Sequence, residues 1–307
     1  MERTVLILGT GGTIAGVSAT PDDLVGYRAG ALGVEELAQA LPELSGLPLS
    51  FEQLASIDSK DMDFVTWQRL ATRIQQAVTD EATEAVVITH GTDTLEETAY
   101  LLHRVLDTPK PVILTAAMRP ASSRSPDGPQ NLLDAISLAR SAGVQGVLVS
   151  LHGKVHAADR VRKVHTYRVD AFDSPDGGPL AFVENGCVRS LAPWPTPSGL
   201  GIKRLMRSPW PRIEFLTNCV DADGALVPLL QELAEREARP LGLVVAGTGN
   251  GTLSTALEAA LMRAQSQGVA VLRCSRCAAG PVLGGELPSA GSLSAPQARV
   301  ELLLQLL

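Results

Sequence analysis

The sequence predicts an α/β fold of two domains with mainly parallel sheets, the N-terminal domain larger than the C-terminal one. A chain of 307 residues accommodates two domains at roughly 100–200 residues each. Short β-branched runs alternate with longer segments of helical period, the pattern of a parallel sheet covered on both faces. A stretch rich in Pro, Gly and Ser interrupts this alternation once. We therefore expect an N-terminal domain over 1–189, a linker over 190–212 and a C-terminal domain over 213–307.

The N-terminal part alternates strands and helices throughout. Apolar runs predict strands over residues 4–9, 49–56, 84–90, 111–117 and 146–152. Segments of helical period predict helices over 33–44, 63–82, 94–106 and 129–143. Thr94 and Glu97 have capping-box spacing, which predicts a helix start near residue 95. Since ligands of such sheets bind at the carboxyl ends of the strands, polar residues directly after the strands are the candidate site.

The C-terminal part repeats the alternation on a smaller scale. Strands are expected over residues 212–218, 241–247 and 269–275. Helices are expected over 224–237, 252–268 and 295–307. This order predicts a second, smaller parallel sheet.

Composition excludes several classes of protein. A formal net charge of −7 argues against a nucleic-acid binder, whose footprint is basic. No apolar run approaches the roughly 18 residues of a membrane-spanning helix. Residues 4–17 faintly resemble a signal peptide, but glycine interrupts the apolar run early and Glu2 weakens the positive end. We interpret this segment as the first buried strand of a cytoplasmic protein.

The cysteines and histidines do not predict a metal site. Cys274 and Cys277 form a lone C-x-x-C without a second pair or a nearby histidine, so we expect both to fill space beside a strand. His152 and His156 have helical ligand spacing, but a glycine between them weakens a helix there. We expect no metal.

The first strand ends in the stretch "LILGTGGTIAGV", from Leu6 to Val17. Its glycines do not fit the dinucleotide-binding pattern, and no lysine follows them as in a phosphate-binding P-loop. The stretch therefore combines a permissive backbone with one hydroxyl, that of Thr13, at its centre. The alternative is an ordinary tight turn in which Thr13 caps a helix.

The third strand ends in "THGTDTLEETA", which places Thr92 and Asp93 ahead of a helix N-terminus. Asp93 could pair with a substrate ammonium group, or it could only cap the helix. Lys163 follows the fifth strand, and beside Thr92 and Asp93 it could act as a base or orient one. The alternative is a solvent-exposed lysine in a loop. Ser59 and Lys60 follow the second strand in the same way.

Together the stretches "TGGTIAG", "HGTDTLEETA", "AMRP" and "AGTGNGTL", in this order, resemble the bacterial-type L-asparaginase/glutaminase family. The resemblance covers the chain from about Thr10 to Leu304. It implies hydrolysis of the side-chain amide of asparagine to aspartate and ammonia, with no metal ion and no organic cofactor. It also implies a homo-oligomer, a dimer or a tetramer, in which each site is completed by a neighbour's C-terminal domain.

The resemblance further implies roles for individual residues. Thr13 is similar to the family's nucleophile, and Tyr27 to the tyrosine on a mobile lid that assists it. Thr92, Asp93 and Lys163 resemble a second polar cluster. Substrate contacts are implied for an α-carboxylate at Ser59, an α-ammonium at Asp93, an oxyanion at the N–H groups of Gly12 and Thr92, and further contacts at Lys60 and Ala117.

Three positions depart from the family pattern. Lys60 stands where many members carry glutamine or glutamate, so its charge repels a substrate ammonium if it points inward and is harmless if it points outward. Thr252 replaces an asparagine, and Glu286 aligns loosely with an acidic residue of the family. The preference between asparagine and glutamine therefore stays open.

Other functions are compatible with these motifs. A non-catalytic amino-acid binding protein of the same fold would keep the site but release no ammonia. The amide-hydrolysing subunit of a tRNA-dependent amidotransferase usually carries an extra N-terminal domain, for which a first strand near Thr4 leaves no room. A nucleotide-dependent oxidoreductase would bind a dinucleotide tightly.

Overall fold

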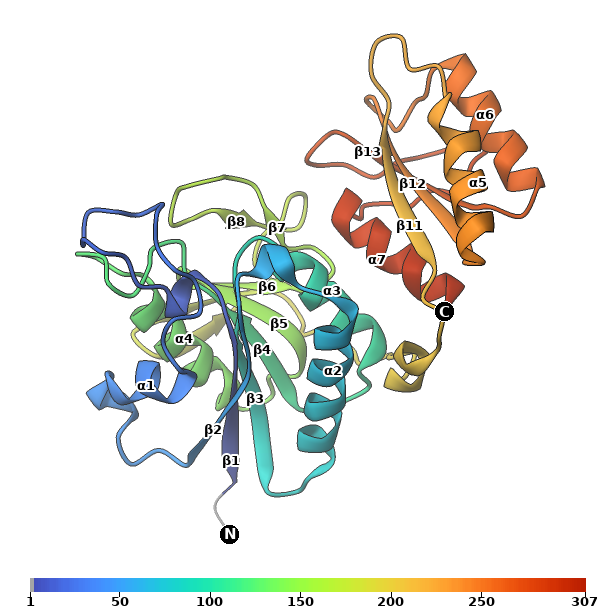
Figure 1. Cartoon of the computed structure of the whole chain (residues 1–307). Helices are drawn as coiled ribbons and strands as arrows, with labels where there is room; N and C mark the ends of the chain where they lie inside the picture. The colour runs from blue at the N-terminus through green and yellow to red at the C-terminus, as the bar shows by residue number, and fades with distance from the viewer. Residues whose placement is uncertain (1–2) are drawn as a thin grey trace. The chain divides into compact units, whose positions relative to one another are not determined.

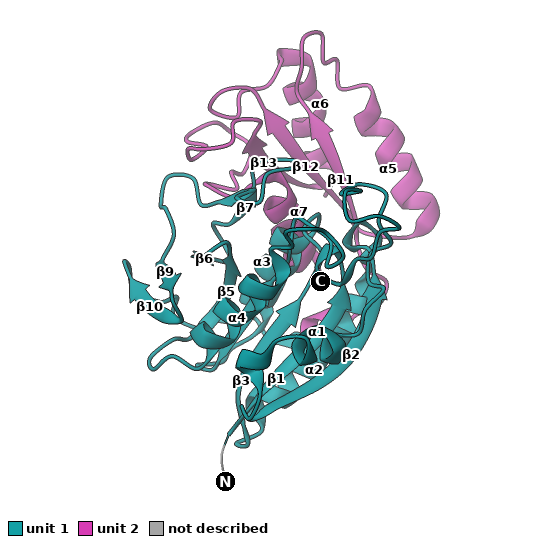
Figure 2. Ribbon diagram, turned by 90° about the vertical axis from the view of Figure 1, so that its left-hand side faces the viewer, with its two compact units in different colours: residues 1–202 teal, residues 203–307 magenta. Residues whose placement is uncertain are grey.

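A computed structural model describes residues 3–307. The chain forms two compact units, residues 1–202 and 203–307, drawn in separate colours in Figure 2. Their boundary falls within the stretch 190–212 that the composition suggests as a linker.

The first unit is built on an eight-stranded sheet in the order β10-β9-β6-β5-β4-β3-β1-β2 (Figure 1). The five predicted strands are confirmed as parallel strands β1 (Thr4–Gly11), β2 (Leu49–Ile57), β3 (Thr83–Thr89), β4 (Pro111–Thr115) and β5 (Gly146–Leu151). Along the chain, β2 lies on one side of β1 and β3 on the other. The direction of winding thus reverses between β1 and β3, the kind of position at which open α/β sheets bind ligands.

Four helices cover the sheet. They are α1 (Val34–Gln39), α2 (Phe64–Thr79), α3 (Leu95–Val105) and α4 (Gly128–Ala139). α1 and α4 share one hydrophobic core on one face, and α2 and α3 lie on the other (Figure 1). The helix start near residue 95 is confirmed, but the capping box is wrong: Thr94 makes no side-chain cap bond, because its hydroxyl donates to Ser59 O.

One connection has an unusual hand. β1–α1–β2 runs towards one edge of the sheet, while β2–α2–β3 and β3–α3–β4 run towards the other edge over the opposite face. β4–α4–β5 continues in the second direction, yet α4 lies on the face of α1. It therefore has the opposite hand to the other three, against the rule that about 98% of such crossovers are right-handed.

The sequence did not predict the antiparallel strands of the first unit. β6 (Lys154–Ala157), β9 (Ala181–Glu184) and β10 (Cys187–Ser190) extend the sheet beyond β5. β7 (Arg162–Lys163) and β8 (Phe172–Asp173) form a separate two-stranded ladder. Strands of two to four residues are too short to show a period of alternating apolar residues.

The second unit carries the predicted parallel sheet, in the order β11-β12-β13. Its strands are β11 (Arg212–Thr217), β12 (Leu241–Gly247) and β13 (Ala270–Ser275), and its helices are α5 (Leu226–Glu237), α6 (Thr255–Ser266) and α7 (Ala295–Leu306). Cys274 is buried on β13, as predicted, whereas the prediction for Cys277 is wrong because that side chain is exposed. Among the described residues, no helix has the length and apolarity needed to cross a bilayer.

Candidate active site

Two glycine turns meet at the carboxyl ends of β1 and β3. Gly12 has φ +82°, and a Cβ there would lie 2.4 Å from Gly91 Cα. A Cβ on Gly91 would in turn lie 2.5 Å from Ser59 Oγ. Only glycine permits such backbone contact. The contact brings the turns that carry Thr13 and Thr92 together.

The first polar pair is Thr13 with Tyr27. Thr13 is buried at the start of a single 3-10 turn, η1 (Thr13–Ala15), and its Oγ1 lies 2.6 Å from the Tyr27 hydroxyl. Gly16 makes room for the tyrosine ring, since a Cβ there would lie 2.7 Å from Tyr27 Cδ2. The two side chains predicted to act together are therefore in direct contact.

The oxyanion prediction needs one correction. The backbone N–H of Gly12 donates to Ile57 O at 2.9 Å, so it is not available to a ligand. Within residues 3–307, the backbone N–H groups of Thr13 and Thr92 donate to no other group. These two N–H groups are therefore free to donate to a ligand.

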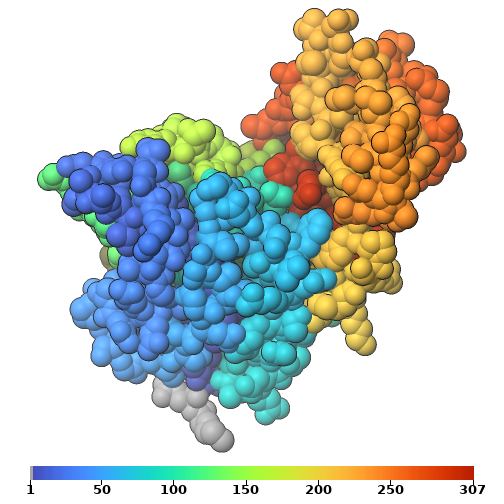
Figure 3. Space-filling view, in the orientation of Figure 1, coloured from blue at the N-terminus to red at the C-terminus, as the bar shows by residue number. Residues whose placement is uncertain are grey.

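Tyr27 lies on a surface segment, residues 18–27, which we call the lid. A β-bridge between Val17 and Arg28 closes its base. The lid contacts the β4–α4 loop, residues 116–127, through the Ser18 and Ser122 hydroxyls at 2.8 Å and an Arg124–Asp22 ion pair at 2.6 Å. In Figure 3 the dark blue lid lies beside the green loop at the surface.

The second polar cluster consists of Thr92, Asp93 and Lys163. Lys163 Nζ donates to Thr92 Oγ1 at 2.9 Å and to Asp93 Oδ1 at 2.6 Å. The lysine side chain is 20% exposed and that of Asp93 52% exposed, and both line an open hollow of about 520 Å³. Lys163 is thus not a free surface lysine. Asp93 does not cap α3 either, because the N-cap residue is Thr94.

Ser59 and Lys60 follow β2 but differ in their surroundings. Ser59 is buried, and its Oγ accepts the Asp93 N–H at 3.1 Å. Lys60 is 62% exposed, and its Nζ lies 2.6 Å from Asp58 Oδ2. The hydrogen bond to Asp58, with the nearby Asp58 charge, raises the pKa of Lys60. Of the two orientations considered for Lys60, the structure therefore has the outward one, in which its ammonium group faces solvent.

The remaining predicted residues lie around or away from this site. Ala117 is buried and packs with Ile14 and Ala15 behind the Thr13 turn. Thr252 and Glu286 lie in the second unit, where the Thr252 hydroxyl donates to Thr248 O at 2.9 Å and Glu286 is exposed.

Two buried titratable residues next to the site were missed from the sequence. Burial lowers the pKa of His90 to about 4, and its Nδ1 donates to Gly91 O at 2.7 Å. Burial raises the pKa of Glu96 to about 7, and its Oε2 accepts the Lys163 N–H at 3.1 Å. The signal was present, because both residues lie inside the "HGTDTLEETA" stretch. Neither residue type at a strand end or helix start predicts burial by itself.

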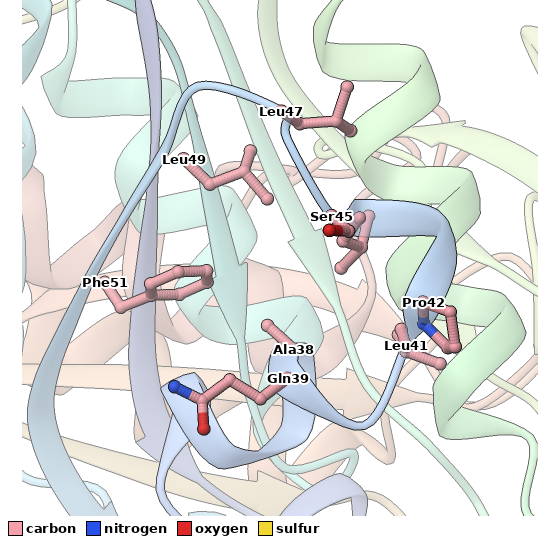
Figure 4. A pocket seen from close by; sticks show the side chains of 9 residues that line it. Ala38, Gln39, Leu41, Pro42, Ser45, Leu47, Leu49 and Phe51 are labelled. Carbon is pink, nitrogen blue, oxygen red and sulfur yellow. The ribbon is translucent and has the colours of Figure 1, made fainter.

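A second hollow on the same unit lacks such chemistry. It has a volume of about 410 Å³ and lies between α1, η2 (Pro42–Leu44) and β2 (Figure 4), and no residue of the two polar clusters lines it. None of its lining side chains is titratable. Over residues 3–307, no cluster of three or more His, Cys, Asp or Glu side chains could bind a metal ion.

The chain matches two family models and several known proteins. Residues 4–195 match the family model of the N-terminal asparaginase domain, and residues 213–307 match that of the glutaminase/asparaginase C-terminal domain. L-asparaginase 2 of Escherichia coli is 37% identical, with 90% of this chain and 78% of that protein covered. Glutaminase-asparaginase of Pseudomonas fluorescens is 36% identical, with 90% and 76% covered.

A solved structure is similar over the whole chain. It is described as a probable cytoplasmic L-asparaginase from Campylobacter jejuni, and it matches with a TM-score of 0.90 at 35% identity, covering 100% of this chain and 95% of that one. The fold is that of the L-asparaginases, which are amidohydrolases. The chain belongs to the asparaginase family.

Proposed function

We propose that this protein is an L-asparaginase that hydrolyses the side-chain amide of L-asparagine with Thr13 as nucleophile. The observation that carries the proposal is the buried Thr13 hydroxyl, 2.6 Å from Tyr27 and in a turn that contacts the one bearing Thr92. An amide is a poor electrophile, so its attack by a hydroxyl needs both a proton acceptor and donors for the oxyanion.

The reaction proceeds in two steps. Thr13 Oγ1 bonds to the amide carbon while Tyr27 takes up the hydroxyl proton and gives its own to the departing nitrogen. The free N–H groups of Thr13 and Thr92 donate to the oxyanion. Ammonia leaves, and water then cleaves the threonyl ester, which releases aspartate and restores the hydroxyl. Lys163 holds Thr92 and Asp93 in place throughout.

The rest of the substrate is zwitterionic. Asp93 is partly exposed beside the hollow, so its carboxylate is placed to pair with an α-ammonium. Ser59 Oγ accepts from Asp93 N–H, which leaves its own proton free for an α-carboxylate. Together they select an amino acid over a simple amide.

The test is ammonia release from purified protein. Asparagine is expected to yield ammonia and aspartate in equal amounts. We also propose a weaker activity on glutamine, because the Pseudomonas fluorescens relative is named a glutaminase-asparaginase; steady-state kinetics on both substrates measure the ratio. A protein that binds aspartate but releases no ammonia from either amide would instead be a binding protein.

Assembly and location are part of the same proposal. We propose a homo-oligomer, a dimer or a tetramer, which light scattering measures, and catalysis without metal or cofactor, which a chelator-insensitive activity supports. A cytoplasmic location agrees with the name of the Campylobacter jejuni structure, although the Haemophilus influenzae relative is named periplasmic. Cell fractionation decides between the two.

Replacing Lys60 is expected to change little. Its ammonium is bonded to Asp58 and exposed to solvent, so the charge reaching an α-ammonium is small. For Lys60→Gln we expect kcat and KM for asparagine within about twofold of wild type. A KM lowered tenfold or more would show that Lys60 turns inward when substrate binds.

Weakening the lid contact is expected to make the activity less sensitive to salt. The Arg124–Asp22 pair is 75% and 69% exposed, so salt screens it at high ionic strength and its contribution is small. For Arg124→Ala we expect kcat/KM to fall about two- to fivefold at low salt and to lose the salt dependence of wild type. Arg119→Ala on the same loop is the control. If Arg124→Ala, Arg119→Ala and wild type had the same dependence of kcat/KM on salt, the Arg124–Asp22 ion pair would have no role in closing the lid.

A further inference from the structure

Lys163 is held at two points by one short stretch of chain. Its Nζ donates to Thr92 Oγ1 and Asp93 Oδ1. Its backbone N–H donates to Glu96 Oε2 at 3.1 Å. The next residue, Val164, donates its N–H to Ala171 O directly beside the β7–β8 ladder, so the Lys163 N–H faces away from β8 towards α3. Glu96 thus ties the lysine's own backbone to the helix that follows Thr92 and Asp93.

Glu96 is an unusual residue to find in this place. Its side chain is 9% exposed and lies in the first turn of α3, where the helix dipole favours a negative charge. Its carboxylate makes no close ion pair of its own in the described part of the chain. The groups that act on it are Glu97 on the same helix and Arg162 and Lys163 on β7.

We propose that Glu96 is a positioning residue for the reaction: its carboxylate fixes the backbone of Lys163, and its negative charge stabilises the Lys163 ammonium that holds Thr92 and Asp93. The inference rests on the proposed function. It assigns a role to a buried side chain that does not touch the substrate.

The ionisation of Glu96 gives this role a pH dependence. Burial raises the pKa of Glu96 from 4.5 to about 7, against the opposing effects of the Lys163 N–H, Arg162 and Lys163 charges. Above this value the carboxylate accepts a charge-assisted hydrogen bond, which is stronger than the bond to a neutral carboxyl group. We therefore expect kcat to rise as the pH increases through about 7.

The ionisation of Glu96 affects the stability of the fold in the opposite direction to kcat. Because the pKa of Glu96 is higher in the fold than its ordinary value, the unfolded chain releases this proton first, and the folded state loses stability as the pH rises from 4.5 to about 7. Ionised Glu96 therefore lowers the stability of the fold, so a role in stability does not explain this buried carboxylate. A role in positioning Lys163 does.

The decisive variant is Glu96→Gln, which keeps an oxygen acceptor and removes the charge. We expect kcat at pH 8 to fall about tenfold, the order of one charge-assisted hydrogen bond, with KM within twofold. The rise of kcat near pH 7 is expected to disappear, while the thermal midpoint at pH 8 equals or exceeds that of wild type. Glu97→Gln, one residue along the same turn, is the control; it keeps the rise but moves it to lower pH, because the Glu97 charge raises the pKa of Glu96.

Two further measurements keep the proposal testable if Glu96→Gln does not fold or if the proposed function fails. They are the kinetics of Glu96→Asp and ammonia release by the wild-type protein. Glu96→Asp keeps the charge but is one methylene too short for Lys163, so low kcat with the pH 7 rise retained is expected. Wild-type kcat in Glu96→Gln, with the rise intact, would overturn the role of Glu96 while leaving the proposed function standing. Wild-type protein that releases no ammonia at any pH would overturn the proposed function first.

Discussion

Thr13→Ala is expected to lower kcat for asparagine by roughly 10⁴-fold, as loss of a nucleophile does in other covalent mechanisms. The change removes the Thr13 hydroxyl, the atom that we propose bonds to the amide carbon. It leaves the backbone of the turn intact, because η1 has no side-chain cap and its N-cap residue is Gly12. Aspartate binding, measured by calorimetry, is therefore expected to change little.

Two control variants separate chemistry from folding. Thr13→Ser restores a hydroxyl and is expected to recover a large part of kcat. Thr10→Val removes a buried hydroxyl on β1, three residues before Thr13, that donates to Thr89 O. It is expected to lower the free energy of unfolding by about 1 kcal/mol but not kcat. Equal kcat in Thr13→Ala and wild type would remove Thr13 from the mechanism.

Thr92→Val is expected to be the next most damaging change, with kcat lowered by about 10²–10³-fold. Valine keeps the volume of threonine but cannot accept the Lys163 Nζ hydrogen bond. The lysine then keeps only Asp93 as its side-chain partner, and the donor group beside the oxyanion loses its fixed position. Rapid-quench measurement of the first turnover shows whether bond formation itself is slowed.

A double-mutant cycle with Lys163→Met tests whether the two residues act as a unit. Lys163→Met alone is expected to lower kcat somewhat less than Thr92→Val, if the lysine only orients its partners. Because both variants remove the same contact, the double variant should be no slower than the worse single one. Additive losses of activation free energy would mean that Thr92 and Lys163 contribute independently.

The parallel core could be predicted from the sequence because it depends on local patterns. Buried strands such as 84–90 contain an uninterrupted apolar run, here residues 85–88, and the helices between the strands keep a clear period. The two-residue strand that carries Lys163 has no such pattern. Its position depends on the Glu96 carboxylate and on pairing with β8, both tertiary contacts.

Errors at the site have the same physical origin. Thr94 has the sequence of a helix cap, but Ser59, 35 residues away, takes its hydroxyl. Gly12 lies beside the candidate nucleophile, but Ile57 on β2 takes its N–H. Residue type and spacing identify which groups gather at a strand end, whereas hydrogen bonds from neighbouring strands decide which of them stay free for a ligand.

The reversed β4–α4–β5 crossover determines which loops support each half of the catalytic apparatus. With α4 beneath Thr13, the segment that leads into it emerges under the tyrosine-bearing lid and can anchor it. α3 lies on the other face of the sheet, and there its Glu96 carboxylate accepts the backbone N–H of Lys163 on β7. Because of this topology, the support of the lid and the support of Lys163 lie on opposite faces of the sheet and share no helix.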